Sequence, residues 1–151
     1  MADPVTITLL GEPVAWRHRT SPDGRHRYLP TKQRNISATL RLAAQDAMFI
    51  GGNYAVVRPV IDEPVRIELM AEFTIPDSWS KKKKAAAIRQ EILPGKRPDL
   101  SNTLKLIEDS LNGIVFRDDC LICEMHCRKR YSVQPKITIT IEPINATLQL
   151  E

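Results

Sequence analysis

The chain has 151 residues, 42% of them hydrophobic and 26% charged, proportions typical of one soluble globular domain, so we expect a single domain over residues 1–151. No stretch approaches the roughly 20 apolar residues of a membrane-spanning helix, and "MADPVTITLL" lacks the features of a signal peptide, so we expect a cytoplasmic protein with no membrane partner. The formal net charge of +4 hints at an anionic partner.

The first part of the sequence predicts a strand, a basic arm and a helix. "VTITLL" (residues 5–10) alternates apolar residues with threonine, as a half-buried strand does. Residues 11–30 contain the turn sequence "SPDG" and are expected to form either a basic hairpin arm or a mobile loop. From Asn35 to Ile50, apolar residues recur at helical spacing until Gly51 and Gly52 end the pattern.

The second part predicts a long strand, two helices and two more strands. "EPVRIELMAEFTIP" (residues 63–76) places its apolar residues on one face of a strand. "DSWSKKKKAAAIRQEIL" (residues 77–93) opens with capping residues and continues with good helix formers. A second helix near residues 100–111 is followed by strands in "CLICEMHCRKRY" and "KITITIEP". The predicted fold class is α/β (α+β), a mixed β-sheet with helices packed against it.

Basic residues are concentrated in three blocks. The members are Arg17, Arg19, Arg25, Arg27, Lys32 and Arg34 in the first, Lys81, Lys82, Lys83 and Lys84 in the second, and Arg128, Lys129 and Arg130 in the third. Together the blocks could line one nucleic-acid path, or they could be separate solvated patches. Composition favours neither interpretation.

The three cysteines lie close to His126 and raise the question of a zinc site. Zinc sites usually pair a short Cys spacing with a second ligand pair far along the chain. In a strand, Cys123 and Cys127 would point to one face, and Cys120 and His126 to the other. We therefore expect reduced cysteines in a strand rather than a zinc site.

The segment "KRPDLSNTLKLIEDSLNGIVFRDD" (residues 96–119) carries the most specific pattern. Asp99 is expected to cap a helix whose apolar stripe faces the core, with Asn102, Lys105 and Asp109 together on the opposite side. Asn112 and Gly113 end this helix, and the chain then returns so that an aspartate pair, residues 118–119, lies near it.

These charges have two interpretations. A capping aspartate, a Lys105–Asp109 surface pair and an acidic loop would be ordinary solvated features. Against this, the adjacent carboxylates of Asp118 and Asp119 repel each other unless a cation or a partner neutralises them. An acidic centre in a basic protein is also what metal-dependent phosphodiester hydrolysis requires, which favours a site for a metal ion.

Residues 96–119 resemble the signature of the RusA family of Holliday-junction resolvases, Mg²⁺-dependent endonucleases often encoded by prophages. That signature reads roughly K-P-D-x-D-N-x-x-K, then D-A-L-N-G, then D-D. The likeness extends over most of the chain, through "GEPVAWRHRT", "RYLPTKQR", "IPDSWSKKKK" and "EMHCRKRY". It implies a small mixed α/β fold, a homodimer with one active site per subunit, and paired nicks across a four-way DNA junction.

The resemblance also implies roles for individual residues. By position, the metal-binding aspartates are Asp99 and Asp119, and Lys105 completes the catalytic set. Asp118 is a possible further metal ligand, while Asn102 and Asp109 match supporting positions.

One position departs from the pattern, since the family's middle metal-binding aspartate is Ser101 here. A hydroxyl can coordinate Mg²⁺ but adds no negative charge to attract it.

The sequence thus leads to a Mg²⁺-dependent endodeoxyribonuclease, with Mn²⁺ as a substitute ion, that resolves Holliday junctions in recombination and repair. DNA contacts are expected from Arg17, Arg19, Arg25, Arg27, Lys81, Lys82, Lys83, Lys84 and Lys129. Two alternatives stay open: a junction-binding dimer that has lost cleavage because of Ser101, and a basic α/β domain whose aspartate pair is only a turn.

Overall fold

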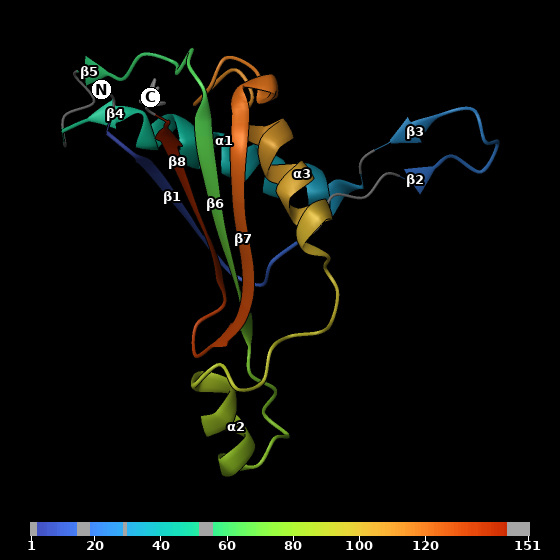
Figure 1. The fold of residues 1–151 in the computed structure, drawn as a ribbon. Coiled ribbons are helices and arrows are strands. Elements are labelled where there is room, and N and C mark those ends of the chain that lie inside the picture. The colour runs from blue at the N-terminus through green and yellow to red at the C-terminus, as the bar shows by residue number, and fades with distance from the viewer. Residues whose placement is uncertain (1–2, 15–18, 29, 52–55, 145–151) are drawn as a thin grey trace, which may run out of the picture.

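A mixed four-stranded sheet forms the centre of the molecule (Figure 1), in the order β1-β8-β6-β7. The computed structural model describes residues 3–14, 19–28, 30–51 and 56–144. The sheet strands are β1 (Val5–Leu10), β6 (Val65–Thr74), β7 (Ile122–Ser132) and β8 (Lys136–Pro143). β8 pairs antiparallel with β1 and β6, whereas β6 and β7 run parallel. The predicted α+β arrangement is confirmed.

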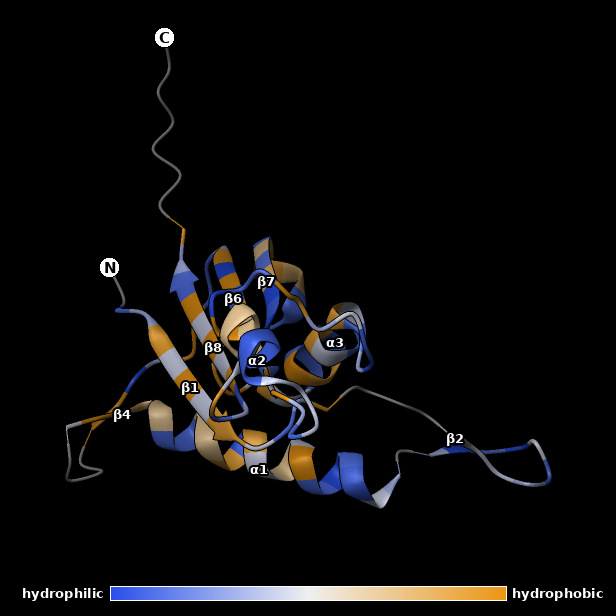
Figure 2. Cartoon of the chain, turned by 90° about the horizontal axis from the view of Figure 1, so that it is seen from below, coloured by the Kyte–Doolittle hydropathy of each residue, from blue (hydrophilic) through white to orange (hydrophobic). Residues whose placement is uncertain are grey.

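One face of the sheet is apolar because these strands alternate as their sequences predict. Ile67 and Leu69 of β6 and Ile139 of β8 are almost fully buried, while the threonines beside Ile139 are only partly covered. Figure 2 shows this alternation as orange and pale bands along β1 and β8.

Two helices cover the apolar face, α1 (Thr31–Ala47) and α3 (Leu100–Leu111). From α3, Leu104, Ile107 and Leu111 are buried as predicted, and so is Leu106, so the helix buries more than one stripe. No helix in the described part of the chain is both long and apolar enough to cross a membrane.

The predicted bounds of the first helix, 35–50, were wrong at both ends. α1 begins at Thr31, directly after Pro30. The sequence did not indicate this start, because the Pro30 side chain cannot cap a helix and the polar residues that follow it show no apolar pattern. Residues 49–50 instead form β4 (Phe49–Ile50), which pairs with β5 (Val56–Val57). Pairing with the next strand along the chain therefore overrides the local helical spacing.

A small second core lies beyond the lower end of the sheet, in a lobe formed by residues 75–96 and called the α2 lobe below. It consists of Phe73 and Tyr131 from the strand ends with Ile75 and Ala87. Helix α2 (Lys81–Ile88) begins at Ser80, whose hydroxyl accepts a hydrogen bond from the Lys83 N–H at 3.2 Å.

The predicted helix over residues 77–93 was therefore too long. Gln90 adopts a left-handed conformation with φ of 62°, and the Glu91 N–H donates to the Ala86 carbonyl at 3.0 Å. This closing turn ends the helix although the residues after Ile88 are good helix formers.

The basic arm forms a hairpin of β2 (Arg19–Thr20) and β3 (Arg27–Tyr28). Figure 1 shows it projecting from the body on the side where α3 lies. The hairpin, one of the two predicted alternatives, is thus the form that these residues take. Arg17 lies outside the described residues.

Candidate active site

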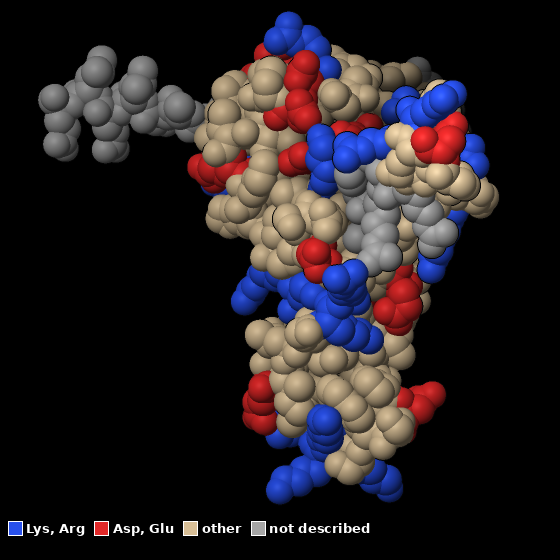
Figure 3. All heavy atoms as spheres, turned by 90° about the vertical axis from the view of Figure 1, so that its right-hand side faces the viewer, with Lys and Arg blue, Asp and Glu red and all other residues tan. Residues whose placement is uncertain are grey.

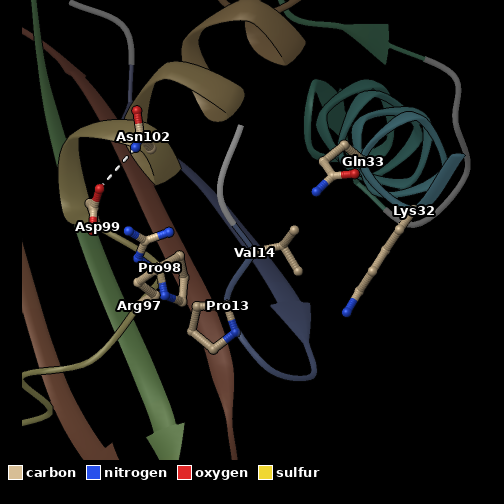
Figure 4. Close-up of a pocket in the computed structure, with 8 residues that line it drawn as sticks. All are labelled: Pro13, Val14, Lys32, Gln33, Arg97, Pro98, Asp99 and Asn102. Atoms are coloured by element: carbon tan, nitrogen blue, oxygen red, sulfur yellow. Dashed lines mark hydrogen bonds between the residues drawn. The ribbon is translucent and has the colours of Figure 1, made fainter. Parts of the chain in front are cut away.

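Asp99 lies at the N-terminal end of α3, where the signature places it. It occupies the capping position, but its side chain forms no capping hydrogen bond, contrary to the prediction. Its carboxylate instead accepts a hydrogen bond from the Asn102 side-chain amide at 2.9 Å (Figure 4). Because Asp99 and its neighbour Ser101 are both exposed, their oxygens are accessible to a ligand.

Lys105 lies further along the same exposed side of α3. Its ammonium is 3.0 Å from the Asp109 carboxylate, and this hydrogen bond, together with the nearby charge of Asp119, raises the pKa of Lys105. The structure therefore brings Lys105, Asp109 and Asp119 into one electrostatic cluster, as the sequence predicted from the short return of the chain. Lys105 is a fixed cation at the working pH of most enzymes.

Asp118 and Asp119 differ in their surroundings. One carboxylate oxygen of Asp118 accepts a hydrogen bond from the Cys120 N–H at 3.0 Å, which lowers the pKa of Asp118. Asp118 thereby caps the short 3-10 helix η1 (Asp119–Leu121) that carries Asp119. Asp119 is half-buried and Asp118 is exposed.

Glu108 is a member of this cluster that the sequence reasoning missed. It is half-buried on α3, and burial raises its pKa. The positive charge of Lys105 opposes this rise, whereas the weaker effects of Asp119 and Asp109 add to it. Its spacing could have indicated its position, because residues 101, 105 and 108 fall on one face of an α-helix.

The acidic residues form two groups rather than one closed cage. No hydrogen bond or ion pair joins Asp99 to the 118–119 segment among the described residues, and no three Cys, His, Asp or Glu side chains there are grouped to hold a metal ion. The donor chemistry nevertheless fits Mg²⁺, since these are hard oxygen donors and Mg²⁺ usually takes one or two carboxylates and completes its shell with water and substrate phosphate.

A cavity of about 400 Å³ opens beside Asp99 (Figure 4). Its walls come from the first turns of α1 and α3 and from the segment after β1. Pro13 and Val14 form its apolar side, Lys32 and Gln33 come from α1, and Arg97 precedes α3. The sequence reasoning placed Lys32 only in a general basic block and did not single out Arg97 or Gln33.

Basic side chains of the hairpin and of α2 lie around this region. Seen from the side on which the hairpin projects, Lys and Arg gather between the sheet and the α2 lobe and again at the far end of that lobe (Figure 3). Arg25 and Arg27 of the hairpin and Lys81 and Lys82 of α2 are exposed. The structure describes the backbone of Arg19 but not its side chain.

The remaining basic candidates are partly engaged within the chain. The Lys83 ammonium lies 3.9 Å from the centre of the Trp79 ring, and Lys84 is half-buried. The Lys129 ammonium donates to the Lys96 carbonyl and lies 5.2 Å from the Phe73 ring.

The cysteine segment differs in part from its prediction. Cys120 lies in η1 and not in a strand, while Cys123 and Cys127 lie in β7. All three are free thiols, and burial raises the pKa of Cys127.

Comparison with known families decides the identity. The model of the family described as endodeoxyribonuclease RusA matches residues 11–142. The chain belongs to the RusA family. The match begins directly after β1, extends into β8, and includes Asp99, Lys105 and Asp119.

A relative is also found among curated proteins. The uncharacterized protein YqaN of Bacillus subtilis (strain 168) is 30% identical over 151 residues, covering 95% of this chain and 99% of that protein. Membership of the RusA family makes this chain a nuclease of the endodeoxyribonuclease type, in a family that acts on junction DNA.

Proposed function

We propose that this RusA-family chain is a Mg²⁺-dependent, structure-selective endodeoxyribonuclease that resolves four-way junctions by paired nicks in recombination and repair. The observation that carries the proposal is the position of Asp99 and Lys105 on the exposed side of α3, with Asp119 of η1 close enough for its charge to act on Lys105. The N-terminal end of α3 lies between the hairpin and the α2 lobe, which are both basic (Figure 1). Such a surface combines acidic groups for a metal ion with cations for a polyanion.

Asp99 and Asp119 are the proposed metal-holding residues, with Ser101 and Asp118 as additional oxygen donors. When bound, Mg²⁺, or Mn²⁺ in its place, would polarise the scissile phosphate and lower the pKa of a bound water. Asn102 holds the Asp99 carboxylate through its 2.9 Å hydrogen bond and so fixes the direction of that donor. Asp118 fixes the turn on which Asp119 lies.

Lys105 is proposed to stabilise negative charge on the phosphate being cut. Its present partner is Asp109, four residues along the same helix, and both side chains are more than a third exposed. A surface pair of this kind contributes only about 0.3–0.5 kcal/mol. Lys105 can therefore exchange Asp109 for a phosphate oxygen at little cost.

The DNA arms are proposed to run along the hairpin and the α2 lobe. Arg25 and Arg27 form no side-chain hydrogen bond or ion pair within the described residues, and the same is true of Lys81 and Lys82. Free cations of this kind bind phosphates without reading bases. Selectivity for a junction would then come from the shape of the DNA and the spacing of its arms.

Paired nicks further require two active sites, so we infer a homodimer in which each subunit cuts one strand. A bacterial or phage-encoded protein acting in the cytoplasm would meet this substrate during recombination.

A second candidate function is junction binding without efficient cleavage. Ser101 removes one carboxylate from the signature, and no three Cys, His, Asp or Glu side chains among the described residues are arranged to hold a metal ion. A weak affinity for Mg²⁺ would leave a protein that binds and folds junctions but cuts them slowly.

A cleavage assay on a labelled four-way junction distinguishes these possibilities. Symmetric nicks that require Mg²⁺ or Mn²⁺ and are absent from a duplex of the same sequence support resolution. A gel shift without nicks at any metal concentration supports the binding protein. The absence of both would reject a role on junctions.

A further inference from the structure

The cavity beside Asp99 carries two cations that have no partner. Lys32 and Arg97 are exposed, and neither side chain forms a hydrogen bond or an ion pair with the part of the chain that the structure describes. Asp99 is the one carboxylate among the lining residues, and its carboxylate is bonded to Asn102. The charge of the cavity therefore favours an anion.

The two helices that form the walls reinforce this charge. Lys32 and Gln33 belong to the first turn of α1, and Asn102 belongs to the first turn of α3. Neither first turn contains an acidic residue, and neither helix has a side-chain cap. Both helices thus direct their positive ends toward the same region, which adds to the attraction that the cations already provide.

The position of the cavity specifies which anion it would meet. Asp99 lines the cavity and is also a proposed metal-holding residue, so a DNA strand cut at Asp99 must pass across its mouth. Pro13 and Val14 give the cavity an apolar side on which a deoxyribose can pack. A phosphate and its sugar fit within about 400 Å³.

We propose that this cavity binds a backbone phosphate next to the scissile one, with Lys32 and Arg97 as its two ligands. The proposal rests on the proposed function, because the bound phosphate belongs to the strand that is cut. Its effect is positional: a phosphate held between α1 and α3 fixes which neighbouring phosphate lies at Asp99.

The test compares three variants, Lys32→Gln, Arg97→Gln and the double variant, with a matched control. Arg41→Gln removes one exposed cation from the same helix as Lys32, and nine residues at about 100° each place Arg41 on the opposite side of α1. Binding to a four-way junction is measured in EDTA, so that cleavage does not enter the result. Unchanged melting temperatures confirm that each variant is folded. If Arg97→Gln does not fold, the comparison of Lys32→Gln with Arg41→Gln still tests the subsite.

Each single variant is expected to lose roughly tenfold in affinity and to flatten the log–log salt slope by about one unit. The double variant should lose less than the product of the two single losses, because both cations bind one phosphate. A junction with a neutral methylphosphonate beside each of its two symmetric cleavage positions should bind wild type and variants equally. Arg41→Gln should behave as wild type on every junction.

Four results would overturn the subsite. In the first, the variants match Arg41→Gln while wild type still binds and nicks junctions, which leaves the proposed function standing. In the second, no methylphosphonate position near the cut removes the difference between wild type and variants. A changed preference for the cleaved dinucleotide with an unchanged salt slope would mean that Gln33 and Asn102 read a base edge there instead. Failure of wild type to bind any junction would overturn the subsite and the proposed function together.

Discussion

Asp118 and Asp119 are adjacent in the sequence, yet their surroundings imply different roles. Asp118 uses one oxygen to cap η1, while Asp119 is the member of the pair that contributes to the raised pKa of Lys105. Asp119→Asn should abolish cleavage and leave junction binding intact or tighter, because a negative charge facing the phosphate is lost. Asp118→Asn should retain most cleavage, because asparagine caps a helix as well as aspartate does.

Both variants are compared in a metal titration on a labelled junction, with binding measured separately. Equal loss of cleavage in the two variants would make Asp118 a metal ligand. Normal cleavage by Asp119→Asn would remove Asp119 from the site.

Ser101 is the position where the chain departs from its family signature. It is exposed in the first turn of α3, two residues after Asp99, and that turn has no acidic residue. A carboxylate there would interact favourably with the helix dipole, by about 0.3–1 kcal/mol. Ser101→Asp should therefore fold normally, lower the Mg²⁺ concentration for half-maximal nicking, and increase thermal stabilisation by Mg²⁺.

Ser101→Asn is the matched control, because it adds a side chain of similar size without charge. If both variants keep the metal dependence of wild type, position 101 does not face the ion.

Glu108 gives a test of the electrostatic cluster in the absence of metal. Burial raises its pKa, so the folded protein holds this proton to a higher pH than the unfolded chain does. At low pH Glu108 is protonated and neutral, so its burial does not lower the free energy of unfolding. As pH rises through the raised pKa, the carboxyl group ionises and the free energy of unfolding falls. Glu108→Gln should gain stability over wild type between about pH 4 and pH 7, measured by denaturant unfolding in EDTA.

Glu91→Gln is a control of opposite sign. Its hydrogen bond with Arg89 lowers the pKa of Glu91, so this residue contributes stability that is lost as pH falls. A Glu108→Gln variant whose relative stability does not change with pH would contradict the burial of that carboxylate.

At the scale of elements, the sequence predicted best where local pattern and tertiary burial agree. β6 alternates over most of its length, and its predicted inward face is buried from Val65 to Phe73, although Glu72 of the opposite face is buried as well. α3 combines an apolar stripe with Gly113, whose φ of 77° allows the chain to turn back. The same segment carries the family signature, so its site residues could be placed by position.

Prediction failed where strand pairing, an unusual backbone conformation or the packing of separate elements decides. The last residues of the predicted first helix pair with β5, the next strand along the chain, and α2 ends at a left-handed glutamine that no propensity indicates. The cavity is lined by both Lys32 and Arg97, residues that are far apart in the sequence. A single sequence pattern cannot contain that information, because the two residues belong to different elements.

The β2–β3 hairpin is the element with the clearest separate role. It projects from the body, so loss of its charges should leave folding unchanged (Figure 1). The double variant Arg25→Ala, Arg27→Ala should bind junctions more weakly and flatten the salt slope by about two units. Its cleavage rate at saturating protein should match wild type, since neither residue lies at Asp99 or Asp119.

The comparison uses binding across a salt series and single-turnover cleavage, with Arg41→Ala as the control. A salt slope equal to that of wild type would mean that the hairpin does not touch DNA.

At the scale of the whole molecule, the active site lies between two basic projections. The hairpin extends from one side and the α2 lobe from the lower end of the sheet, and the N-terminal end of α3 lies between them (Figure 1). One such surface can hold one strand at one site. Two symmetric cuts therefore need a second copy of the chain, and this requirement can be tested through mixed dimers.

Wild-type chains mixed with an excess of Asp119→Asn, under conditions that allow subunits to exchange, should form dimers with one active site. On a supercoiled plasmid with an extruded cruciform, wild type should produce linear DNA by two cuts in one binding event. Mixed dimers should make one cut, so the product should shift toward nicked circles as the excess of Asp119→Asn rises.

An equal excess of Arg41→Gln, which retains its active site, should leave linear DNA as the main product. If Asp119→Asn lowers the total rate without changing the ratio of linear to nicked product, the two cuts do not come from paired subunits, because a monomer that cuts twice would give a constant ratio.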